Sequence, residues 1–503
     1  MEKKSIWPIL RMIILLVQLF FQSLCTTFVL RLDVLPGKYI TLFLGAMVML
    51  AVCTGLLAFL HIHGRIALWR KIISGILALT ITLGCGAVFK LAMDAHNLVQ
   101  DFTGDISDTR NTYVVVRSDD TAQSVKDTKN YRYGVLVDYD VEHTEQMLAV
   151  IKQQTGTAVT PAGYNQAALM VESLYGGEVD ALIMNGVSLS LLIEQPGFEN
   201  FLSRVRLLYT LPYQDTEKED VETEKEEVDT EKESGEDPFV VYISGSDTRS
   251  TLLKVSRSDV NILAVVNPKT KQILLINTPR DYYVPNPAGK GALDKLTHCG
   301  NYGINCSIEA LENLYDAEID YYGQINFTGF EKLIDAIGGI TVVAEHSFTA
   351  FSSHYFMKGE NKVDGKKALA FARERYNVRD GDNARGKHQM QVITAVINKL
   401  SSSKTLIAKY SEILKSLDGM FTTNFTAEEI SDLVKMQMND MSPWNIKSYA
   451  VTGEGDFAET YSWKGQELYV SWPNEETVDY AKTLISRVLN GETLTTEDMT
   501  MPK

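Results

Sequence analysis

The sequence predicts an α/β protein anchored in a membrane. We expect three N-terminal transmembrane helices, a small extracytoplasmic α/β accessory domain, and a larger α/β domain whose central mixed sheet is flanked by helices. Three long apolar segments come first, and beyond them short apolar runs alternate with segments of helical periodicity. An acidic stretch divides this alternation in two. With 503 residues, the chain also exceeds the roughly 250 to 300 residues that one hydrophobic core supports. We therefore divide it into residues 1–95, 101–213, 214–237 and 238–503.

The membrane domain is predicted from the apolar segments 10–30, 40–60 and 72–93. Each is long enough to cross a hydrocarbon core of roughly 30 Å as a helix. A cleavable signal peptide is the alternative for the first segment. However, no small-residue cleavage site follows it, and two more apolar segments come at close spacing. We therefore expect three membrane spans.

Basic residues indicate the orientation of these spans. Lys3 and Lys4 precede the first segment, and the second loop carries Arg65, Arg70 and Lys71. Because positively charged flanks stay on the cytoplasmic side, the N-terminus is expected inside the cell. An odd number of spans then places both α/β domains outside the cytoplasm.

The accessory domain, residues 101–213, shows the alternation of a small α/β fold. Apolar runs at 133–140 and 181–186 predict strands, and residues 144–154 have helical periodicity. Asp138 and Asp140 end the first run, a position where α/β domains often place ligand-binding groups. Strand-end aspartates that face water are the simpler interpretation.

Residues 214–237 are expected to form a flexible linker. From residue 215 onward they hold 13 Asp and Glu against three Lys, which is −10 of the formal net charge of −16. A segment so charged and so poor in apolar residues does not bury enough surface to fold. Most of the net negative charge of the chain therefore belongs to a flexible linker. A negative net charge also argues against binding of nucleic acid.

The second α/β domain, residues 238–503, has its motif-bearing core in residues 238–400. An apolar strand opens it, and the runs 261–268 and 272–281 predict a hairpin around an Asn-Pro-Lys-Thr turn. Helical patterns occupy residues 308–315, 327–337, 364–372 and 385–400. Residues 403–503 continue the alternation of strand and helix patterns, with a strand pattern at 463–472 and a helical pattern at 476–489. They are expected to complete the domain.

Arginines and aspartates recur where the predicted strands of this domain end. They are Asp247, Arg249, Arg257, Asp259, Arg280, Asp281, Arg373, Arg375, Asp382 and Arg385. A guanidinium group offers a planar fork of donors for phosphate oxygens, and carboxylates hold magnesium. Any one such pair is most simply a surface ion pair. Their recurrence after apolar strands predicts a shared pyrophosphate site.

The segments that carry these residues resemble a known family. In order they read GSDTR, SRSD, NTPRD, DKL, DAIGGITV, DGKKALAFARER and GDNARGKHQ, and they span most of residues 238–400. The sequences of these segments and their order resemble those of the LytR-CpsA-Psr (LCP) family of cell-envelope proteins. The three spans and the accessory domain further resemble the capsule-type CpsA members of Gram-positive bacteria.

The resemblance implies a membrane-anchored, magnesium-dependent phosphotransferase, although another divalent cation could replace magnesium. Such an enzyme moves a glycan, here a capsular polysaccharide or a related polymer, from an undecaprenyl-pyrophosphate carrier to a peptidoglycan hydroxyl through a phosphodiester. The implied partners are the lipid-linked glycan, the peptidoglycan acceptor, membrane lipid and the capsule synthesis machinery. No nucleic acid is expected.

The resemblance also carries roles onto matching residues. Asp247 and Asp259 are similar to the magnesium-binding carboxylates. The implied pyrophosphate clamp consists of Arg257, Arg280, Arg373 and Arg375, and the further candidate phosphate contacts are Gln389, Arg385, Arg249 and Lys387. Asp281 and Glu374 are expected to orient neighbouring arginines. Asp247 or Asp259 is the candidate general base for the acceptor hydroxyl, provided that the metal does not occupy it fully.

Two departures from the family pattern affect this site. Many members have an Arg-Gln pair where this chain has His388 and Gln389, so part of the positive charge is either missing or supplied by Lys387. The common Ser-Ile-Pro-Arg-Asp segment reads Asn-Thr-Pro-Arg-Asp at residues 277–281.

Some side chains have no assigned part in this chemistry. His298 and His388 are expected to be polar surface residues rather than metal ligands. Cys299 and Cys306 are spaced so that they either form a small-loop disulfide or remain thiols. The helices at 327–337 and 385–400 could line a groove for an isoprenoid chain, although their apolar faces are more simply core.

Two other functions compete with the transferase. One is a membrane regulator that senses lipid-linked polymer and signals to the synthesis machinery through partner proteins or its transmembrane helices. The other is a polyprenyl-pyrophosphate phosphatase, in which water replaces the acceptor hydroxyl.

Overall fold

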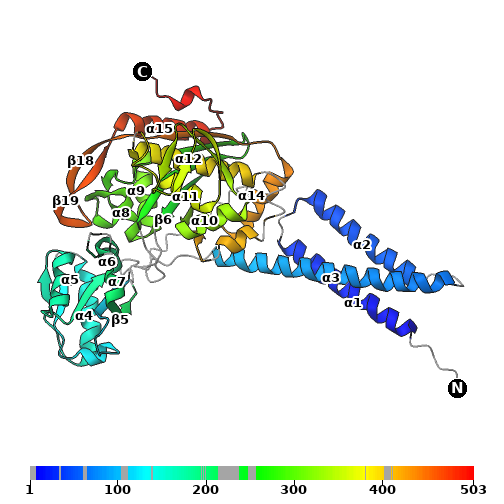
Figure 1. The fold of residues 1–503 in the computed structure, drawn as a ribbon, viewed down its shortest axis with the longest axis horizontal. Coiled ribbons are helices and arrows are strands. Elements are labelled where there is room, and N and C mark those ends of the chain that lie inside the picture. The colour runs from blue at the N-terminus through cyan, green and yellow to red at the C-terminus, as the bar shows by residue number, and fades with distance from the viewer. Residues whose placement is uncertain are drawn as a thin grey trace, which may run out of the picture.

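The predicted fold class is confirmed by the computed structural model, which has three N-terminal apolar helices followed by two α/β units (Figure 1). The structure describes residues 7–32, 35–59, 65–102, 111–137, 140–193, 195, 197–198, 200–212, 237–246, 257–379, 381–401, 409, 412–417 and 419–502. The acidic segment 214–237 lies outside them except for Asp237. Asp138 and Asp247 also lie outside the described residues.

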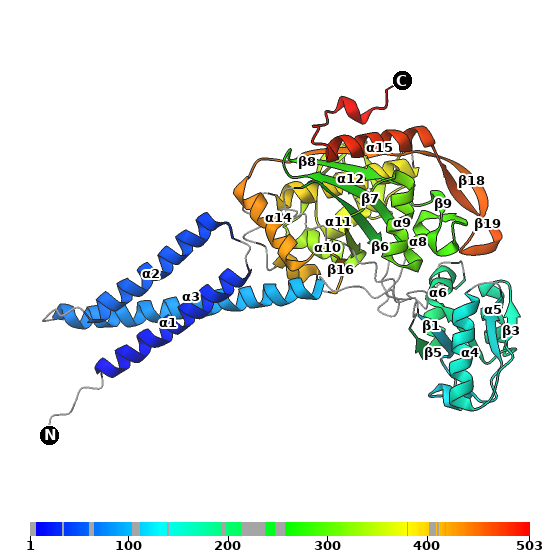
Figure 2. The same cartoon turned by 180° about the vertical axis from the view of Figure 1, so that it is seen from behind.

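The N-terminal helices are α1 (Trp7–Leu32), α2 (Gly37–Phe59) and α3 (Arg65–Phe102). Each contains an apolar stretch of at least 21 residues, long enough to cross a membrane. The 38 residues of α3 rise about 57 Å at about 1.5 Å per residue, well beyond a membrane core of about 30 Å. Its far end contacts β16 of the C-terminal α/β unit, as the two opposite views show (Figures 1 and 2).

Polar residues inside the first apolar segment join α1 to α2. Gln18 is fully buried and donates through Nε2 to Thr54 Oγ1 at 3.0 Å. Arg11 donates to the carbonyl oxygen of Ala58 at 3.3 Å. A hydrocarbon environment offers no competing water, so such contacts help to hold membrane helices together.

The accessory unit is a five-stranded sheet in the order β3-β2-β4-β1-β5. Its strands are β1 (Thr112–Arg117), β2 (Tyr133–Leu136), β3 (Ala162–Tyr164), β4 (Ala181–Asn185) and β5 (Val205–Leu211). Its helices are α4 (Val141–Thr155), α5 (Ala167–Gly176), α6 (Gly186–Leu192) and α7 (Phe201–Arg204). Because β2 runs parallel to both β3 and β4, the carboxyl ends of these three strands meet at one edge.

Asp140 lies at this edge but does not simply face water. Its carboxylate accepts from Asn185 Nδ2 at 2.7 Å and contacts His143 Nδ1, so it ties the start of α4 to the end of β4. The expectation of a solvent-facing aspartate is therefore wrong for Asp140.

The C-terminal unit is built on a six-stranded mixed sheet in the order β16-β11-β6-β7-β8-β17. Its strands are β6 (Phe239–Ser246), β7 (Ser258–Asn267), β8 (Gln272–Asn277), β11 (Tyr321–Asn326), β16 (Phe421–Thr423) and β17 (Asn445–Ala450). The predicted hairpin is the antiparallel pair β7–β8. Residues beyond 403 contribute β16 and β17, so they complete this sheet as expected.

Helices cover both faces of this sheet. On one face α9 (Ile304–Tyr315) and α15 (Glu475–Leu489) pack on buried residues such as Tyr242 and Leu274. On the other face α12 (Gly381–Leu400) packs on Ile262 and Leu275 through Met390. Helices α10 (Phe327–Ala336) and α11 (Gly365–Arg373) pack beside α12 with the small hairpins β12–β15 (Ile340–Ala344, Gly359–Val363) and β13–β14 (Phe348–Ala350, His354–Phe356).

Strand direction fixes which residues meet at the sheet edge. Strands β6 and β11 are parallel, and β7 lies antiparallel between β6 and β8. The carboxyl ends of β6, β8 and β11 therefore share one edge with the start of β7. Polar residues that follow or precede these ends are brought together there.

A buried polar network fastens the hairpin of β18 (Gly453–Thr460) and β19 (Trp463–Pro473) to the rest of the unit. Asp294, fully buried on β10 (Leu293–Lys295), accepts from Asn286 Nδ2 at 3.0 Å and from the backbone N–H of Ser462 at 3.2 Å. His298 Nδ1 lies 2.6 Å from Asp294 Oδ1, and His298 is only 2% exposed. The expectation that His298 is a surface residue is therefore wrong.

The two cysteines near this network are both buried and are thiols in the structure. The Cys306 thiol acts with burial to raise the pKa of Cys299 well above its ordinary value, because the two side chains are hydrogen-bonded. The spacing left open either a disulfide or two thiols, and the structure has two thiols.

Replacing Asp294 by Ala is expected to lower the free energy of unfolding by about 3 kcal/mol or more, because several buried donors lose their acceptor at once. Chemical denaturation of the full chain in detergent, followed by tryptophan fluorescence, measures this loss. The matched control is Glu454→Ala, which removes an exposed carboxylate from β18. Equal midpoints for the two variants would contradict the prediction.

Candidate active site

Five of the predicted site residues gather around the shared edge of the C-terminal sheet. Arg257 and Asp259 lie at the start of β7, and Arg280 follows β8. Arg373 ends α11, and Arg385 lies in the first turns of α12. The fold thus brings together side chains that are more than 120 positions apart in the sequence.

Asp259 is the centre of this cluster and is only 8% exposed. Its Oδ1 atom accepts from Arg280 Nη1 at 2.6 Å, and its Oδ2 atom lies 3.6 Å from Arg385 Nη2. Arg385 Nη2 also donates to the backbone carbonyl of Asp259 at 3.1 Å. One buried carboxylate therefore positions two guanidinium groups from different elements.

The charges around Asp259 control its protonation. Burial by itself would raise the pKa of this carboxyl, but the positive charges of four arginines outweigh burial and hold its pKa below the ordinary value. In order of decreasing effect they are Arg280, Arg385, Arg257 and Arg373. Asp259 is therefore ionised at neutral pH, and the cluster keeps a net positive charge suited to an anion.

Arg373 is positioned by the docking of α11. Asp364 caps this helix as predicted, accepting from the backbone N–H of Lys367 at 2.9 Å. Gly365 allows the close approach of α11 to α10, since a Cβ there would lie 2.1 Å from the carbonyl oxygen of Glu331. The guanidinium of Arg373 lies 4.3 Å from the ring centroid of Phe327, a cation–π contact that fixes its direction.

The residues that follow Arg373 serve the backbone more than the cluster. Glu374 is 2% exposed, and its Oε1 atom accepts from the backbone N–H groups of Arg375, Tyr376 and Asn377. It therefore shapes the turn rather than orienting a guanidinium, contrary to expectation. Asp281, in contrast, does contact Arg280, at 3.6 Å from Nε. Arg375 is half-buried and contacts Tyr376, outside the group that influences Asp259.

Helix α12 buries Arg385 and Gln389 at the cluster and exposes Lys387 between them. Arg385 and Gln389, one turn apart, are each 7% exposed, whereas Lys387 is exposed. At about 100° per residue, Lys387 is turned about 200° from Arg385, so it does not supply the missing charge. Gly386 lets the helix pass close to β8, since a Cβ there would lie 2.3 Å from Asn277 Nδ2.

His388 is buried rather than on the surface, so that prediction is wrong. Its ring stacks on Phe371 at 4.0 Å between centroids, and Nδ1 lies 3.1 Å from the carbonyl oxygen of Phe371. Burial lowers the pKa of His388 below its ordinary value. It is therefore a neutral packing residue at neutral pH and adds no charge to the site.

An apolar cleft opens beside the arginines. Arg373, Arg385 and Gln389 contribute to its wall, and the remainder is almost entirely apolar. The other lining residues are Ile243, Ser244, Gly245, Val260, Ile325, Phe327, Phe330, Leu369, Ala372, Val392 and Ile393. The cleft runs between α10 and α12, the two helices named as candidates to line a groove, although a core role was the simpler expectation for their apolar faces.

Sequence patterns did not reveal two supports of this site. Beneath the cluster, the Tyr242 hydroxyl lies 2.8 Å from Ser258 Oγ and donates to Asn261 Oδ1 at 2.7 Å, which fixes the start of β7. Lys295 donates to Asp281 Oδ1 at 3.0 Å. The sequence does contain both supports, as polar residues within apolar strands and as the Lys of the DKL segment. It does not show which residues these side chains contact.

Asp247 and Arg249 lie outside the described residues, so their place in the site stays a prediction. Among the residues that the structure does describe, no three His, Cys, Asp or Glu side chains form a group suited to a metal ion. Asp259 is the one predicted metal ligand whose position is described. A magnesium site here would have to combine it with Asp247 and with oxygens of the substrate.

Comparisons with known proteins agree with the sequence resemblance. Residues 208–477 match the sequence model of the LytR_cpsA_psr family. A similar curated protein is the polyisoprenyl-teichoic acid–peptidoglycan teichoic acid transferase TagU of Bacillus licheniformis, 35% identical over 198 residues, which are 39% of this chain and 63% of that protein. The TagU of Bacillus mycoides is 32% identical over 231 residues, 46% of this chain and 74% of that protein.

Solved structures were found as well. The crystal structure of B. subtilis TagV is 26% identical in sequence and aligns with a TM-score of 0.43, covering 52% of this chain and 99% of that one. The structure of B. subtilis TagU is 29% identical, with a TM-score of 0.40, and covers 52% of this chain and all of that one.

Replacing Asp259 by Asn is expected to destabilise the chain near neutral pH by about 3 kcal/mol, because four arginines then face an uncharged amide. The folded-state pKa of Asp259 lies below its ordinary value of 3.8. Its stabilisation is therefore complete above that value and is lost as the pH falls through the folded pKa. Denaturant midpoints of parent and variant should converge in acid.

The control for this experiment is Asp364→Asn, which replaces one good helix cap by another and should change little at any pH. A deficit of Asp259→Asn that stays constant from neutral pH into acid would show that shape, rather than charge, causes it.

Proposed function

Because the chain belongs to the LytR-CpsA-Psr family, we propose that it is a membrane-anchored phosphotransferase that moves a polyisoprenyl-linked polymer to peptidoglycan. One observation supports this most strongly. A net positive arginine cluster adjoins an apolar cleft, as a pyrophosphate joined to a prenyl chain requires. The arginines would bind the phosphate oxygens, and the cleft would receive the first isoprene units.

The proposed reaction needs positioning and charge neutralisation more than covalent help from the protein. The acceptor hydroxyl oxygen forms a bond to the phosphorus that carries the glycan. The bond from that phosphorus to the bridging oxygen breaks, so polyprenyl phosphate leaves with the bridging oxygen. The product is a glycan joined to the wall through a phosphodiester, and the hydroxyl proton passes to a base.

The described residues fit a role for magnesium in part. Asp259 Oδ1 is engaged by Arg280, whereas Oδ2 is 3.6 Å from its nearest arginine nitrogen and is the oxygen better placed for a metal ion. Asp247 would be the second protein ligand. Magnesium would supply additional charge neutralisation on the pyrophosphate oxygens. Few protein ligands suffice, because magnesium usually shares its coordination with phosphate oxygens and water.

The two candidate bases are not equivalent. An efficient general base has a pKa near the working pH, and the arginines hold the pKa of Asp259 well away from it. This argues against Asp259 as the proton acceptor and leaves Asp247 as the candidate, provided that magnesium does not occupy both of its carboxylate oxygens. Asp259 then acts by positioning Arg280 and Arg385.

The substrate and the orientation are also proposals. The curated relatives are named for transfer of teichoic acid to peptidoglycan. For this chain we propose a capsular polysaccharide or a related polymer, on the basis of its three apolar helices and its accessory unit. The basic residues that flank the first helix favour a cytoplasmic N-terminus, with both α/β units outside.

Neighbouring positions of α12 test the proposal. Arg385→Met is expected to lower transfer at least about 100-fold, because a buried charge that contacts phosphate is lost, whereas Lys387→Met should leave it unchanged. The assay incubates full-length protein in nanodiscs with polyprenyl-pyrophosphate glycan, magnesium and peptidoglycan, and detects wall-bound glycan by mass spectrometry. Tight lipid binding without attachment, in folded parent protein, would instead support a sensor, and released glycan phosphate would support a phosphatase.

The apolar cleft makes a separate prediction. Ile325 lies in its wall on β11, and Ile325→Trp should obstruct it. The KM for a long-chain polyprenyl donor is expected to rise about tenfold or more, with a smaller change in kcat, because apolar burial contributes mainly to binding. Donors with a two-isoprene chain should discriminate less between parent and variant. An unchanged KM for the long donor would place the lipid elsewhere.

A further inference from the structure

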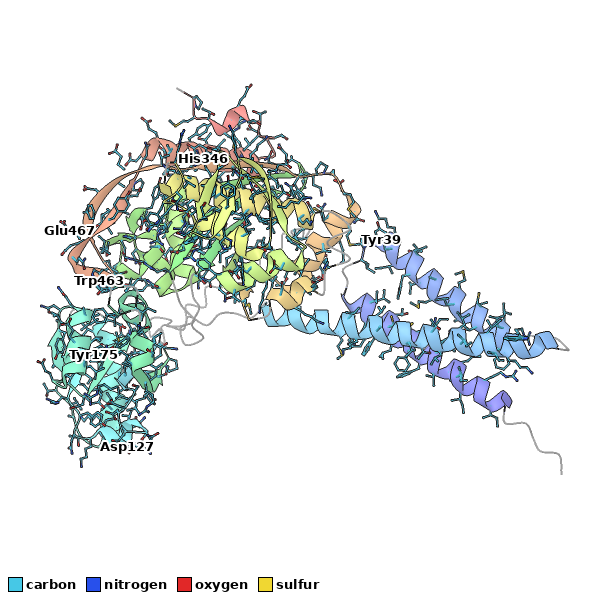
Figure 3. The ribbon with its side chains drawn as sticks, viewed as in Figure 1. Tyr39, Asp127, Tyr175, His346, Trp463 and Glu467 are labelled. Atoms are coloured by element: carbon cyan, nitrogen blue, oxygen red, sulfur yellow. The ribbon has the colours of Figure 1, made fainter. Side chains whose placement is uncertain are left out.

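The accessory unit docks on the C-terminal unit through helix α6 and the tip of the β18–β19 hairpin. Val187 and Leu191 of α6 are 3% and 6% exposed and belong to the same apolar cluster as the C-terminal core. Trp463, at the start of β19, packs against the cores of both units. Figure 3 shows Trp463 at the end of the hairpin nearest the accessory unit.

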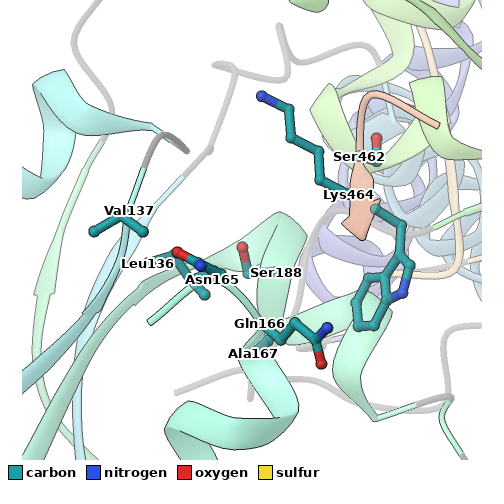
Figure 4. A pocket seen from close by; sticks show the side chains of 9 residues that line it. Leu136, Val137, Asn165, Gln166, Ala167, Ser188, Ser462 and Lys464 are labelled. Atoms are coloured by element: carbon teal, nitrogen blue, oxygen red, sulfur yellow. The ribbon is translucent and has the colours of Figure 1, made fainter. Parts of the chain in front are cut away.

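A cleft lies at this junction (Figure 4). On the accessory side its wall follows the carboxyl ends of β2, β3 and β4, where α/β units commonly bind ligands. These residues are Leu136, Val137, Asn165, Gln166, Ala167 and Ser188. Ser462, Trp463 and Lys464 form the opposite wall. The cleft is separate from the one beside the arginines, with which it shares no residue.

The C-terminal wall of this cleft is held in place before any ligand arrives. The backbone N–H of Ser462 donates to the buried Asp294, and the Ser462 hydroxyl lies 3.0 Å from that of Tyr302. The Trp463 indole N–H donates to Gln466 Oε1 at 3.3 Å. These contacts hold the backbone of Trp463 and Lys464 in place. This wall of the cleft is therefore preorganised for a ligand.

The accessory wall offers polar groups that lack protein partners. Ser188 is only 5% exposed, lines the cleft, and its hydroxyl makes no hydrogen bond to any residue that the structure describes. Helix α5 begins at Ala167 with no side-chain cap from Gln166 and no acidic residue in its first turn. Its first N–H groups therefore have no cap from the Gln166 side chain and carry the partial positive charge of a helix start beside the cleft.

The charge and the hydrogen-bonding groups of the lining residues indicate which class of ligand the cleft could bind. Lys464 is the one ionisable side chain among the cleft's lining residues, and it offers a positive charge to a ligand. The amides of Asn165 and Gln166 and the hydroxyl of Ser188 can each both donate and accept, as ring hydroxyls of a sugar require. The Trp463 indole supplies an apolar, polarisable face.

We propose that this junction cleft binds a sugar unit that carries a carboxylate or phosphate group. Its acidic group would be held by Lys464 and the start of α5, and its hydroxyls by the amides of Asn165 and Gln166 and by Ser188. As the source of this sugar we assign the polymer being transferred, an assignment that rests on the function proposed above. The cleft would then bind the polymer at a second point, away from the pyrophosphate.

Ligand titration of the full-length protein in nanodiscs tests the cleft directly. Glucuronate and glucose 1-phosphate are the probes, glucose is the neutral comparison, and tryptophan fluorescence is the readout. Both acidic sugars should change the fluorescence, and Trp463→Phe should abolish most of that change. Lys464→Met is expected to weaken their binding at least about tenfold, because a charge-assisted hydrogen bond is lost. Lys482→Met, at a half-buried lysine of α15 that does not line the cleft, is the control and should bind as the parent does.

The outcomes separate this proposal from the function of the arginine cluster. Arg280→Ala should lose transfer but keep glucuronate binding, so failure of the transferase proposal leaves this measurement intact. Equal responses to glucose and glucuronate, or wild-type affinity in Lys464→Met, would overturn the acidic-sugar site. Tighter binding of N-acetylmuramoyl dipeptide, with displacement of glucuronate, would overturn the polymer as the source and assign the cleft to the wall.

Discussion

The ion pair between Asp259 and Arg280 is the contact on which the rest of the site depends. At 2.6 Å it joins the start of β7 to the segment after β8, and the same carboxylate positions Arg385 from α12. Four guanidinium groups so close together would repel one another without a buried negative charge between them. The carboxylate lowers this repulsion without cancelling it. The cluster therefore remains stable and yet attracts an anion.

The sheet topology makes this arrangement possible, and the sequence allowed much of it to be predicted. Apolar runs that end in charged residues showed which side chains lie at strand ends, and the parallel order of β6, β8 and β11 brings those ends to one edge. Asp364 as a helix cap was predictable too, because a cap depends on residues a few positions apart. Local patterns are reliable where the interaction itself is local.

Other features depend on contacts that a single sequence does not display. Helix α12 begins at Gly381, earlier than its apolar pattern indicates, and its packing decides that His388 is buried while Lys387 is exposed. Asp294 and Ser462 are 168 positions apart. The DKL segment that contains Asp294 therefore gives no indication of the buried network that anchors the β18–β19 hairpin. Burial of polar residues is decided by these distant partners, which explains why both histidines were misplaced on the surface.

The β18–β19 hairpin connects the two clefts physically. Near one end, the backbone N–H of Ser471 donates to the carbonyl oxygen of Asp281, next to Arg280. At the other end, Trp463 and Lys464 line the junction with the accessory unit. Ser471 lies eight positions beyond Trp463 on the extended strand β19, or about 26 Å away at about 3.3 Å per residue. A polymer bound by its pyrophosphate at the arginines would have to extend about that far to reach the second cleft. A site at that distance would distinguish a chain of several sugars from a single lipid-linked sugar, which the arginine cluster alone cannot do, because it contacts only the phosphates that both share.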